Sequence, residues 1–236
     1  MIWVYAICER PEIPAPRRRG LAQAPLEGVR AGDLLAVITR HSHTPAEPAP
    51  DALWAHERVV ERLMADRAVL PMRFGTTMPD TEALTAAIVR RHAELLQRLA
   101  AVRGRVELGV RAIVTDNGDP AAGMPPAAPA DARRPNGREY LMGKLEEERR
   151  IDHAAAALHE PLARLAVDSR RQPGAPGEVL RAAYLVERAD VGRFLSRVES
   201  LQRAQSVTSV LCTGPWPPYS FVALVGPATR EEAMVR

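Results

Sequence analysis

Cysteine and long apolar runs are both scarce in this sequence. Only two cysteines occur among its 236 residues, Cys8 and Cys212, and they form no CxxC spacing. This excludes a disulfide framework and favours a reduced, cytoplasmic protein. No run of 18 apolar residues occurs, so no membrane span is predicted. The apolar start, Met1 to Cys8, lacks a basic leader and is interpreted as a strand, not as a signal peptide.

Aromatic residues and an excess of one charge are also missing. Aromatic residues make up 4% of the chain, so Leu, Val, Ile and Ala must fill most of the interior. The apolar and charged fractions, 46% and 26%, are ordinary for a globular protein. The 32 cations are interleaved with 29 anions and leave a net charge of +3. This pattern argues against a nucleic-acid-binding surface, and no nucleic acid partner is predicted.

The usual catalytic motifs are absent as well. The chain has no GxxxxGK[ST] phosphate loop, no GxGxxG dinucleotide turn and no GxSxG nucleophile elbow. His56 and Glu57 begin like a zinc-binding HExxH helix, but Val60 occupies the position of the second ligand. His41 and His43 lie in a Pro-rich loop, where solvated histidines are favoured over a zinc site. We therefore predict no catalytic residue, no metal and no cofactor, and a protein that is not an enzyme.

Apolar periodicity divides the chain into two α+β domains, and the first is predicted to cover residues 1–103. Strands are expected at 2–8 and 34–39, and residues 9–32 are interpreted mainly as a long connection. A helix capped by Asp51 and another capped by Asp80 or Thr81 flank a short edge strand that contains Pro71. This order, ββαβα, does not name a fold.

The second domain is predicted to cover residues 104–236. Strictly alternating apolar residues at 105–114 indicate a strand with one buried face. The elements that follow complete the order βαββαβ, which is that of a ferredoxin-like fold. The Pro- and Ala-rich segment 116–137 cannot bury a core and is predicted to be a mobile loop within this domain. The helix after it, at about 138–160, has apolar residues leaning to one side.

Arg73 is a candidate binding residue because it lies among residues that favour burial. A guanidinium in such a place needs a carboxylate, and Glu57 and Glu61 lie one turn apart on the preceding helix. We predict a structural ion pair of Arg73 with these two residues and favour it over a binding role.

The most distinctive run is GPWPPYSF at 214–221. Its prolines, Pro217 and Pro218 among them, stiffen the backbone, while Trp216 and Tyr219 offer large amphipathic surfaces. Two interpretations stay open. These residues either cap a sheet edge and fill the core, or they form a rigid docking patch for another protein.

Six short runs together carry a family resemblance. They are LWAHE at 53–57, VLPMRFG at 69–75, GRVEL at 104–108, GREYL at 137–141, YLV at 184–186 and GPWPPYSF at 214–221. In this order they span nearly the whole chain. On these residues the sequence resembles the gas vesicle protein F/L family.

The resemblance implies a non-enzymatic role in building gas vesicles, the air-filled protein shells that give buoyancy to some bacteria and archaea. Family members are accessory or minor structural components that associate with the major shell protein and with other accessory vesicle proteins. The expected location is the gas vesicle, in the cytoplasm. The family fold is two α+β domains, the second a modified ferredoxin-like one. The choice between the F and L branches stays open.

The resemblance also suggests a site, and two rival functions remain. Trp216 and Tyr219, together with the Arg73 region, are the expected contact with the shell protein. The first rival is RNA binding, which needs stacking aromatic residues on the central strands, and the strand at 105–114 has none. A catalytic function ranks third, because a ferredoxin-like fold does not by itself settle function.

Overall fold

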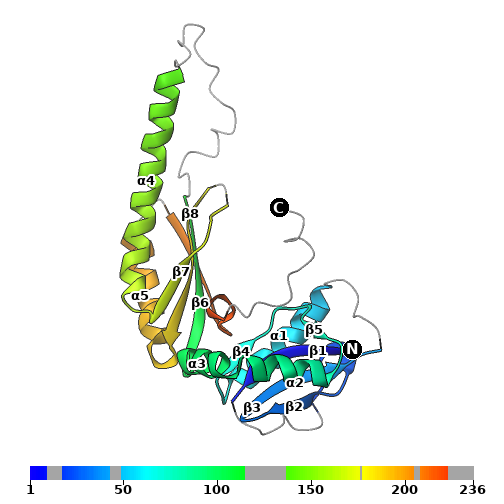
Figure 1. Cartoon of the computed structure of the whole chain (residues 1–236). Helices are drawn as coiled ribbons and strands as arrows, with labels where there is room; N and C mark the ends of the chain where they lie inside the picture. Colours follow the sequence, from blue (N-terminus) through cyan, green and yellow to red (C-terminus); the bar gives the residue numbers. More distant parts are fainter. Residues whose placement is uncertain (10–17, 43–48, 115–136, 176, 205–207, 223–236) are drawn as a thin grey trace. The chain divides into compact units, whose positions relative to one another are not determined.

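The computed structural model describes residues 1–9, 18–42, 49–114, 137–175, 177–204 and 208–222. Contacts divide the chain into two compact units, both built of helices and sheet (Figure 1). The first unit comprises Met1–Glu107 together with the chain from Pro215 onward, and the second comprises Leu108–Gly214. The domain limits expected from the sequence, 1–103 and 104–236, stay a prediction. The contacts of Pro215–Val222 nevertheless lie in the first unit.

The sheet of the first unit is antiparallel and has β1 at its centre. Its strands are β1 (Ile2–Cys8), β2 (Glu27–Ala31), β3 (Leu34–Arg40), β4 (Val69–Pro71) and β5 (Thr77–Met78). They are ordered β2-β3-β1-β4, and β5 also pairs with β1. Every residue of β1 is buried, as its continuous apolar sequence requires.

Strand β2 lies in the stretch that was predicted to be mainly a connection, and that prediction was wrong. The sequence of β2, EGVRA, gives no apolar alternation because β2 is an edge strand with largely half-exposed side chains. Its partner is fixed by a two-residue turn, since Ala31 pairs with Leu34 across Gly32 and Asp33. Gly32 has a φ of 65°, a left-handed conformation that glycine adopts without strain.

Three helices pack on this sheet: α1 (Pro50–Met64), α2 (Thr81–Arg90) and α3 (His92–Val102). The predicted cap of α2 is confirmed, because Asp80 Oδ1 accepts a hydrogen bond from the Ala83 N–H at 2.8 Å. The predicted cap of α1 was wrong. Pro50 occupies the first turn and Ala49 precedes it without a side-chain hydrogen bond, so Asp51 lies inside the helix.

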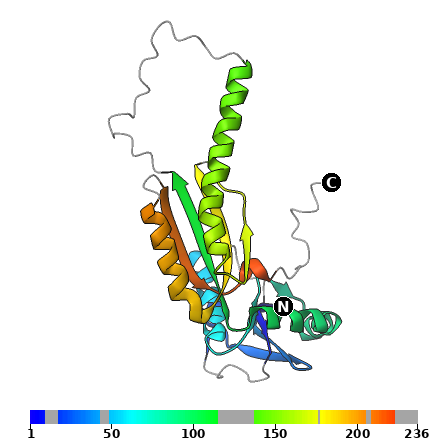
Figure 2. The same cartoon turned by 90° about the vertical axis from the view of Figure 1, so that its left-hand side faces the viewer.

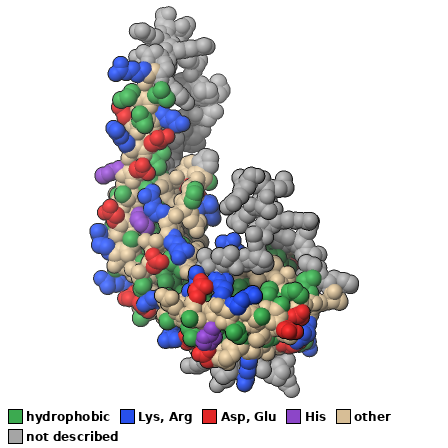
Figure 3. Space-filling model, viewed as in Figure 1, with side chains coloured by type: hydrophobic (Ala, Val, Ile, Leu, Met, Phe, Trp, Pro, Cys, Tyr) green, Lys and Arg blue, Asp and Glu red, His purple; other side chains and the backbone are tan. Residues whose placement is uncertain are grey.

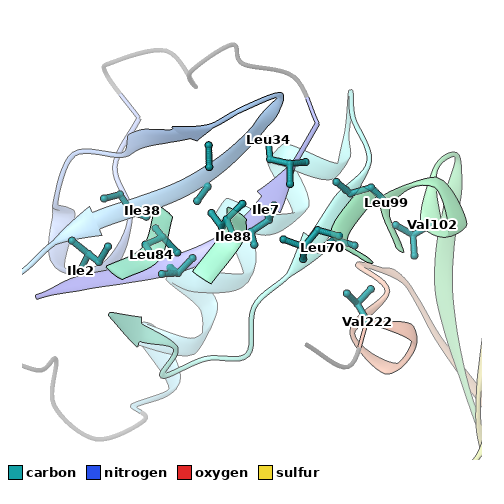
Figure 4. Packing of buried hydrophobic residues seen from close by; sticks show 14 residues of the cluster. Ile2, Ile7, Leu34, Ile38, Leu70, Leu84, Ile88, Leu99, Val102 and Val222 are labelled. Atoms are coloured by element: carbon teal, nitrogen blue, oxygen red, sulfur yellow. The ribbon is translucent and has the colours of Figure 1, made fainter. Parts of the chain in front are cut away.

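The two faces of the sheet are covered by different helices. Ile2 of β1 lies in a core shared with Leu84 and Ile88 of α2 and with Leu99 of α3 (Figure 4). Val4 belongs to the same core, whereas Trp3, between them, bonds to His56 of α1. Val222, from the end of the described chain, packs in the α2–α3 core. That core comprises Ile2, Val4, Ile7, Ala31, Leu34, Ala36, Ile38, Leu70, Leu84, Ile88, Leu95, Leu99, Val102 and Val222.

The second unit is a four-stranded sheet with two helices on one face (Figure 2). Its elements are β6 (Arg105–Val114), α4 (Gly137–Ala163), β7 (Asp168–Arg171), β8 (Glu178–Glu187), α5 (Val191–Ala204) and β9 (Thr208–Trp216). The strands are ordered β7-β8-β6-β9, and β7 pairs with β8 in antiparallel fashion. Leu108 and Val110, spaced two apart on β6, meet Leu158 of α4 and Phe194 of α5 in the core.

Helix α4 is longer than the surface it covers. Ala155, Leu158 and Leu162 are buried, but Leu141 and Leu145 are 60% and 47% exposed. The first half of the helix therefore projects beyond the sheet with apolar and charged side chains together in solvent (Figure 3). The expected apolar side of this helix is thus a buried face only in its second half. The predicted loop at 116–137 lies outside the described residues, apart from Gly137, which begins α4.

Among the residues that the structure describes, no helix has the length and apolarity needed to span a bilayer.

Candidate interaction surface

The chain from Pro215 to Val222, called the closing segment below, packs on the first unit. Pro217 and Pro218 are buried, whereas Trp216 and Tyr219 are half-buried. The Tyr219 hydroxyl donates a hydrogen bond to Glu57 Oε2 of α1 at 2.8 Å. The closing segment is therefore held to a helix that lies 162 residues earlier in the chain.

A second set of contacts holds the closing segment on its other side. The backbone N–H and the hydroxyl of Ser220 donate to the carboxylate of Glu107 at 2.8 and 2.6 Å. Phe221 and Val222 are buried. These contacts support the interpretation of the closing run as a cap on the core. A docking role for Trp216, Pro217, Pro218 and Tyr219 stays a prediction.

Arg73 is exposed, whereas the sequence predicted it to lie among buried residues. Strand β4 ends at Pro71, and Arg73 follows in an exposed loop in which its carbonyl oxygen accepts hydrogen bonds from Thr76. In the described part of the chain Arg73 forms no ion pair with Glu57 or Glu61. The predicted pair is not formed because an exposed guanidinium needs no buried partner, and Glu57 bonds to Tyr219 instead.

Several neighbouring groups act on the carboxyl group of Glu57. Burial raises its pKa, the hydrogen bond from Tyr219 lowers it, and the nearby charges of Glu61 and Glu107 raise it further. Its Oε1 atom is buried and has no hydrogen-bond partner among the described residues. The pKa of Tyr219 is raised strongly, first by burial and then by Glu57. Three carboxylates thus gather around one tyrosine hydroxyl.

His56 holds α1 to the sheet through two hydrogen bonds of its ring. Trp3 Nε1 donates to His56 Nδ1 at 3.0 Å, so His56 Nε2 carries the proton that is donated to the Met72 carbonyl at 2.9 Å. Tyr5 stacks on the imidazole with ring centroids 5.0 Å apart. Burial lowers the pKa of His56 to about 4, which keeps the ring neutral. His56 is therefore a structural residue that positions α1 and Glu57.

The sequence held a signal for this role of His56 that motif reasoning missed. His56 precedes the buried Val59, Val60 and Leu63 at helical spacing, which places it on the inner face of α1. The described residues contain no group of three or more His, Cys, Asp or Glu side chains placed to hold a metal ion.

Leu53 and Trp54 are large apolar residues of α1 that lie open to solvent. Their side chains are 42% and 58% exposed. Glu57 follows Trp54 by three residues and Leu53 by four, so all three side chains are neighbours on the helix surface. Glu61 lies one turn further along. We call Leu53, Trp54, Glu57 and Glu61 the α1 surface.

An exposed tryptophan is typical of a protein-binding surface, because tryptophan is among the side chains that supply most of the affinity at interfaces. The α1 surface thus combines exposed aromatic and aliphatic side chains with two acidic ones. The family model "Gas vesicle synthesis protein GvpL/GvpF" matches residues 1–223, and the chain belongs to this family.

Known proteins from both branches of the family are similar to this chain. Gas vesicle protein L of Streptomyces sp. (strain CB03234) is 30% identical over 257 residues, covering 97% of this chain and 95% of that protein. Gas vesicle protein F of the same strain is 29% identical, covering 93% and 98%. Because the two identities are nearly equal, they do not separate the F branch from the L branch.

A solved structure shares the fold. The crystal structure of gas vesicle protein GvpF from Microcystis aeruginosa aligns with a TM-score of 0.76 at 20% sequence identity. The alignment covers 94% of this chain and 99% of that chain.

Proposed function

We propose that this protein is a non-enzymatic accessory or minor structural protein of gas vesicle assembly that binds the major shell protein and other vesicle proteins. Family membership over residues 1–223 supports the assembly role. The observation that carries the binding role is the exposed Leu53–Trp54 pair on a helix fixed in place by His56 and Tyr219. The site of action is the gas vesicle, in the cytoplasm.

The physical reason for such a protein lies in the shell subunit. A subunit that faces gas on one side exposes an apolar surface before assembly, and this surface aggregates unless a partner covers it. A rigid aromatic side chain contributes a large contact area at low entropic cost. The α1 surface offers such an aromatic side chain in Trp54, which is 58% exposed.

The contact residues expected from the sequence are partly engaged within the chain itself. Pro217 and Pro218 are buried and Tyr219 is bonded to Glu57, so they act by holding the surface in shape. Trp216 is half-buried and Arg73 is exposed, and both retain area for a partner. We therefore centre the contact on Leu53 and Trp54.

We also propose that the second unit is a ferredoxin-like domain. Its element order βαββαβ, its strand order β7-β8-β6-β9 and the placement of α4 and α5 on one face support this assignment.

The test of the binding role is the double variant Leu53→Ala/Trp54→Ala in the full chain, co-expressed with the shell protein. We expect capture of the shell protein to fall about tenfold or more, since truncating a central tryptophan commonly has an effect of this size. Vesicle yield should fall with it.

The matched control is Val89→Ala, which removes an apolar side chain that is 59% exposed on α2 of the same unit. This variant should keep capture and yield. Wild-type capture by a Leu53→Ala/Trp54→Ala variant with unchanged thermal unfolding would show that the contact lies elsewhere.

A further inference from the structure

We infer that the α1 surface receives a basic, apolar segment of the protein partner, in which an Arg or Lys lies about one helical turn from a large aliphatic residue. This inference rests on the proposed function and adds the chemistry of the partner. It follows from the position of the carboxylates among the exposed apolar side chains of α1.

Helical geometry places the four residues in one stripe. Because successive residues are rotated by about 100°, the order around the helix is Leu53, Glu57, Glu61 and Trp54, all within about 100°. Arg58 lies on the far side of Trp54 from Glu57. Leu53 and Glu61 are about 12 Å apart along the helix axis, so a partner segment that follows the stripe from Leu53 to Glu61 covers the two glutamates.

The two glutamates have unused capacity to accept hydrogen bonds. Glu57 Oε2 is engaged by Tyr219, but Glu57 Oε1 is buried without a donor among the described residues. In the described part of the chain no ion pair includes Glu61. Glu57 Oε1 is closed to solvent, so Glu61 is the carboxylate that a cationic donor from a partner can reach through a charge-assisted hydrogen bond, while Glu57 adds negative charge beside it. Glu107 is already engaged by Ser220 and is not part of the inference.

Trp54 favours the same partner chemistry. The face of an indole ring attracts a guanidinium or ammonium group, and the ring edge and Leu53 offer apolar area to an aliphatic side chain. An acidic segment would instead meet Glu57 and Glu61 with like charge as they lose water. The charges of Glu57 and Glu61 therefore favour a basic segment over an acidic one.

The probe is a fluorescently labelled amphipathic helical peptide of Leu and Arg, with a second peptide that has Glu in place of Arg. Binding to the full-length wild type is measured by fluorescence anisotropy at low and high salt. We expect the Arg peptide to bind about tenfold more tightly than the Glu peptide, and high salt to reduce this difference.

Charge variants at Glu61 test the direct role of the carboxylate. Glu61→Gln should lower the affinity for the Arg peptide by about threefold. Glu61→Arg should lower that affinity further and raise the affinity for the Glu peptide. Glu82→Gln, at an exposed acid of α2, is the matched control and should change nothing. Equal binding of the two peptides by the wild type, or equal binding of the Arg peptide by wild type and Glu61→Arg, overturns the inference.

Capture of the shell protein separates this inference from the proposed function. If the Trp54→Ala variant no longer captures the shell protein while the Glu61→Arg variant still does, the inference is wrong and the proposed function stands. If Trp54→Ala keeps the shell protein, the proposed surface is wrong and the inference falls with it. Loss in both variants, with Glu82→Gln unchanged, supports both.

Discussion

Gly20 lies against the ring of Tyr5, where no side chain fits. A Cβ atom at this position would overlap the Tyr5 hydroxyl and lie 2.9 Å from its Cζ and 3.0 Å from Leu26 Cδ2. The hydroxyl cannot move away freely, because it accepts from the Leu21 N–H at 2.7 Å and bonds to Thr39 Oγ1 at 3.1 Å. We predict that Gly20→Ala lowers the free energy of unfolding by about 1–3 kcal/mol, as overpacking usually does.

Urea unfolding measures this loss, and Gly143→Ala is its control. Nothing lies within 4 Å of a Cβ built on Gly143, which is in α4, so that alanine should be neutral or stabilising by up to about 1 kcal/mol. An unchanged midpoint for Gly20→Ala would mean that Tyr5 is not held as described.

His56 makes stability depend on pH in the acidic range. Its folded pKa of about 4 lies below the ordinary 6.5, so the unfolded chain binds more protons between these values. The stability that neutral His56 contributes is therefore complete above about pH 6.5 and is lost as the pH falls toward 4. We predict a loss of about 3 kcal/mol over this window from His56 alone. Denaturant unfolding at a series of pH values measures it.

Other groups titrate in the same range. The contribution of His56 is therefore obtained by comparing the pH-dependent loss of unfolding free energy in the wild type with that in a His56→Gln variant. The wild-type loss should exceed that of His56→Gln, whose slope lacks this contribution. His153→Gln, at an exposed histidine of α4, should behave as the wild type. Parallel pH profiles for wild type and His56→Gln would contradict the buried, neutral assignment.

At the scale of elements, polar contacts hold the closing segment to α1, and deleting a single atom breaks one of them. Tyr219→Phe deletes the donor to Glu57 Oε2 and leaves the half-buried carboxylate without a partner among the described residues. We predict a loss of about 1–3 kcal/mol in the free energy of unfolding, the usual cost of an unsatisfied buried acceptor. Thermal or urea unfolding of the full chain measures it.

A double-mutant cycle identifies the source of that loss. In a Glu57→Met background the acceptor is gone, so Tyr219→Phe should cost much less than in the wild type. Equal costs in both backgrounds would show that the hydroxyl stabilises the chain through some other contact.

The elements that the sequence predicted well are those with a local signal. The alternation at 105–114 gives β6, and Asp80 caps α2 as expected. Edge strand β2 has no such signal, because its pairing with β3 decides its conformation.

The candidate site was predicted less well because its contacts are distant in sequence. The short range from Glu57 to Arg73 suggested an ion pair, whereas the actual partner of Glu57 is Tyr219. The exposure of Trp54 depends on which face of α1 meets the sheet, and that buried face carries His56, which bonds to Trp3, together with Val59, Val60 and Leu63.

At the scale of the whole molecule, family membership rests on the order of motifs rather than on any single site. The resemblance seen in six short runs is confirmed by the family match over residues 1–223 and by relatives that cover more than nine-tenths of the chain. Membership gives the assembly role, while the choice of partner surface comes from the exposure and charge of α1.

The path of the chain makes the second unit an insertion in the first. The chain leaves the first unit after Glu107 and re-enters it at Pro215, along the neighbouring strands β6 and β9, where Thr213 Oγ1 donates to the Gly109 carbonyl at 3.5 Å. An inserted module whose two ends are adjacent can be exchanged for another without breaking its host. Cutting the chain after residue 214, by contrast, would leave the inserted module whole and remove part of its host, Val222 of the core included.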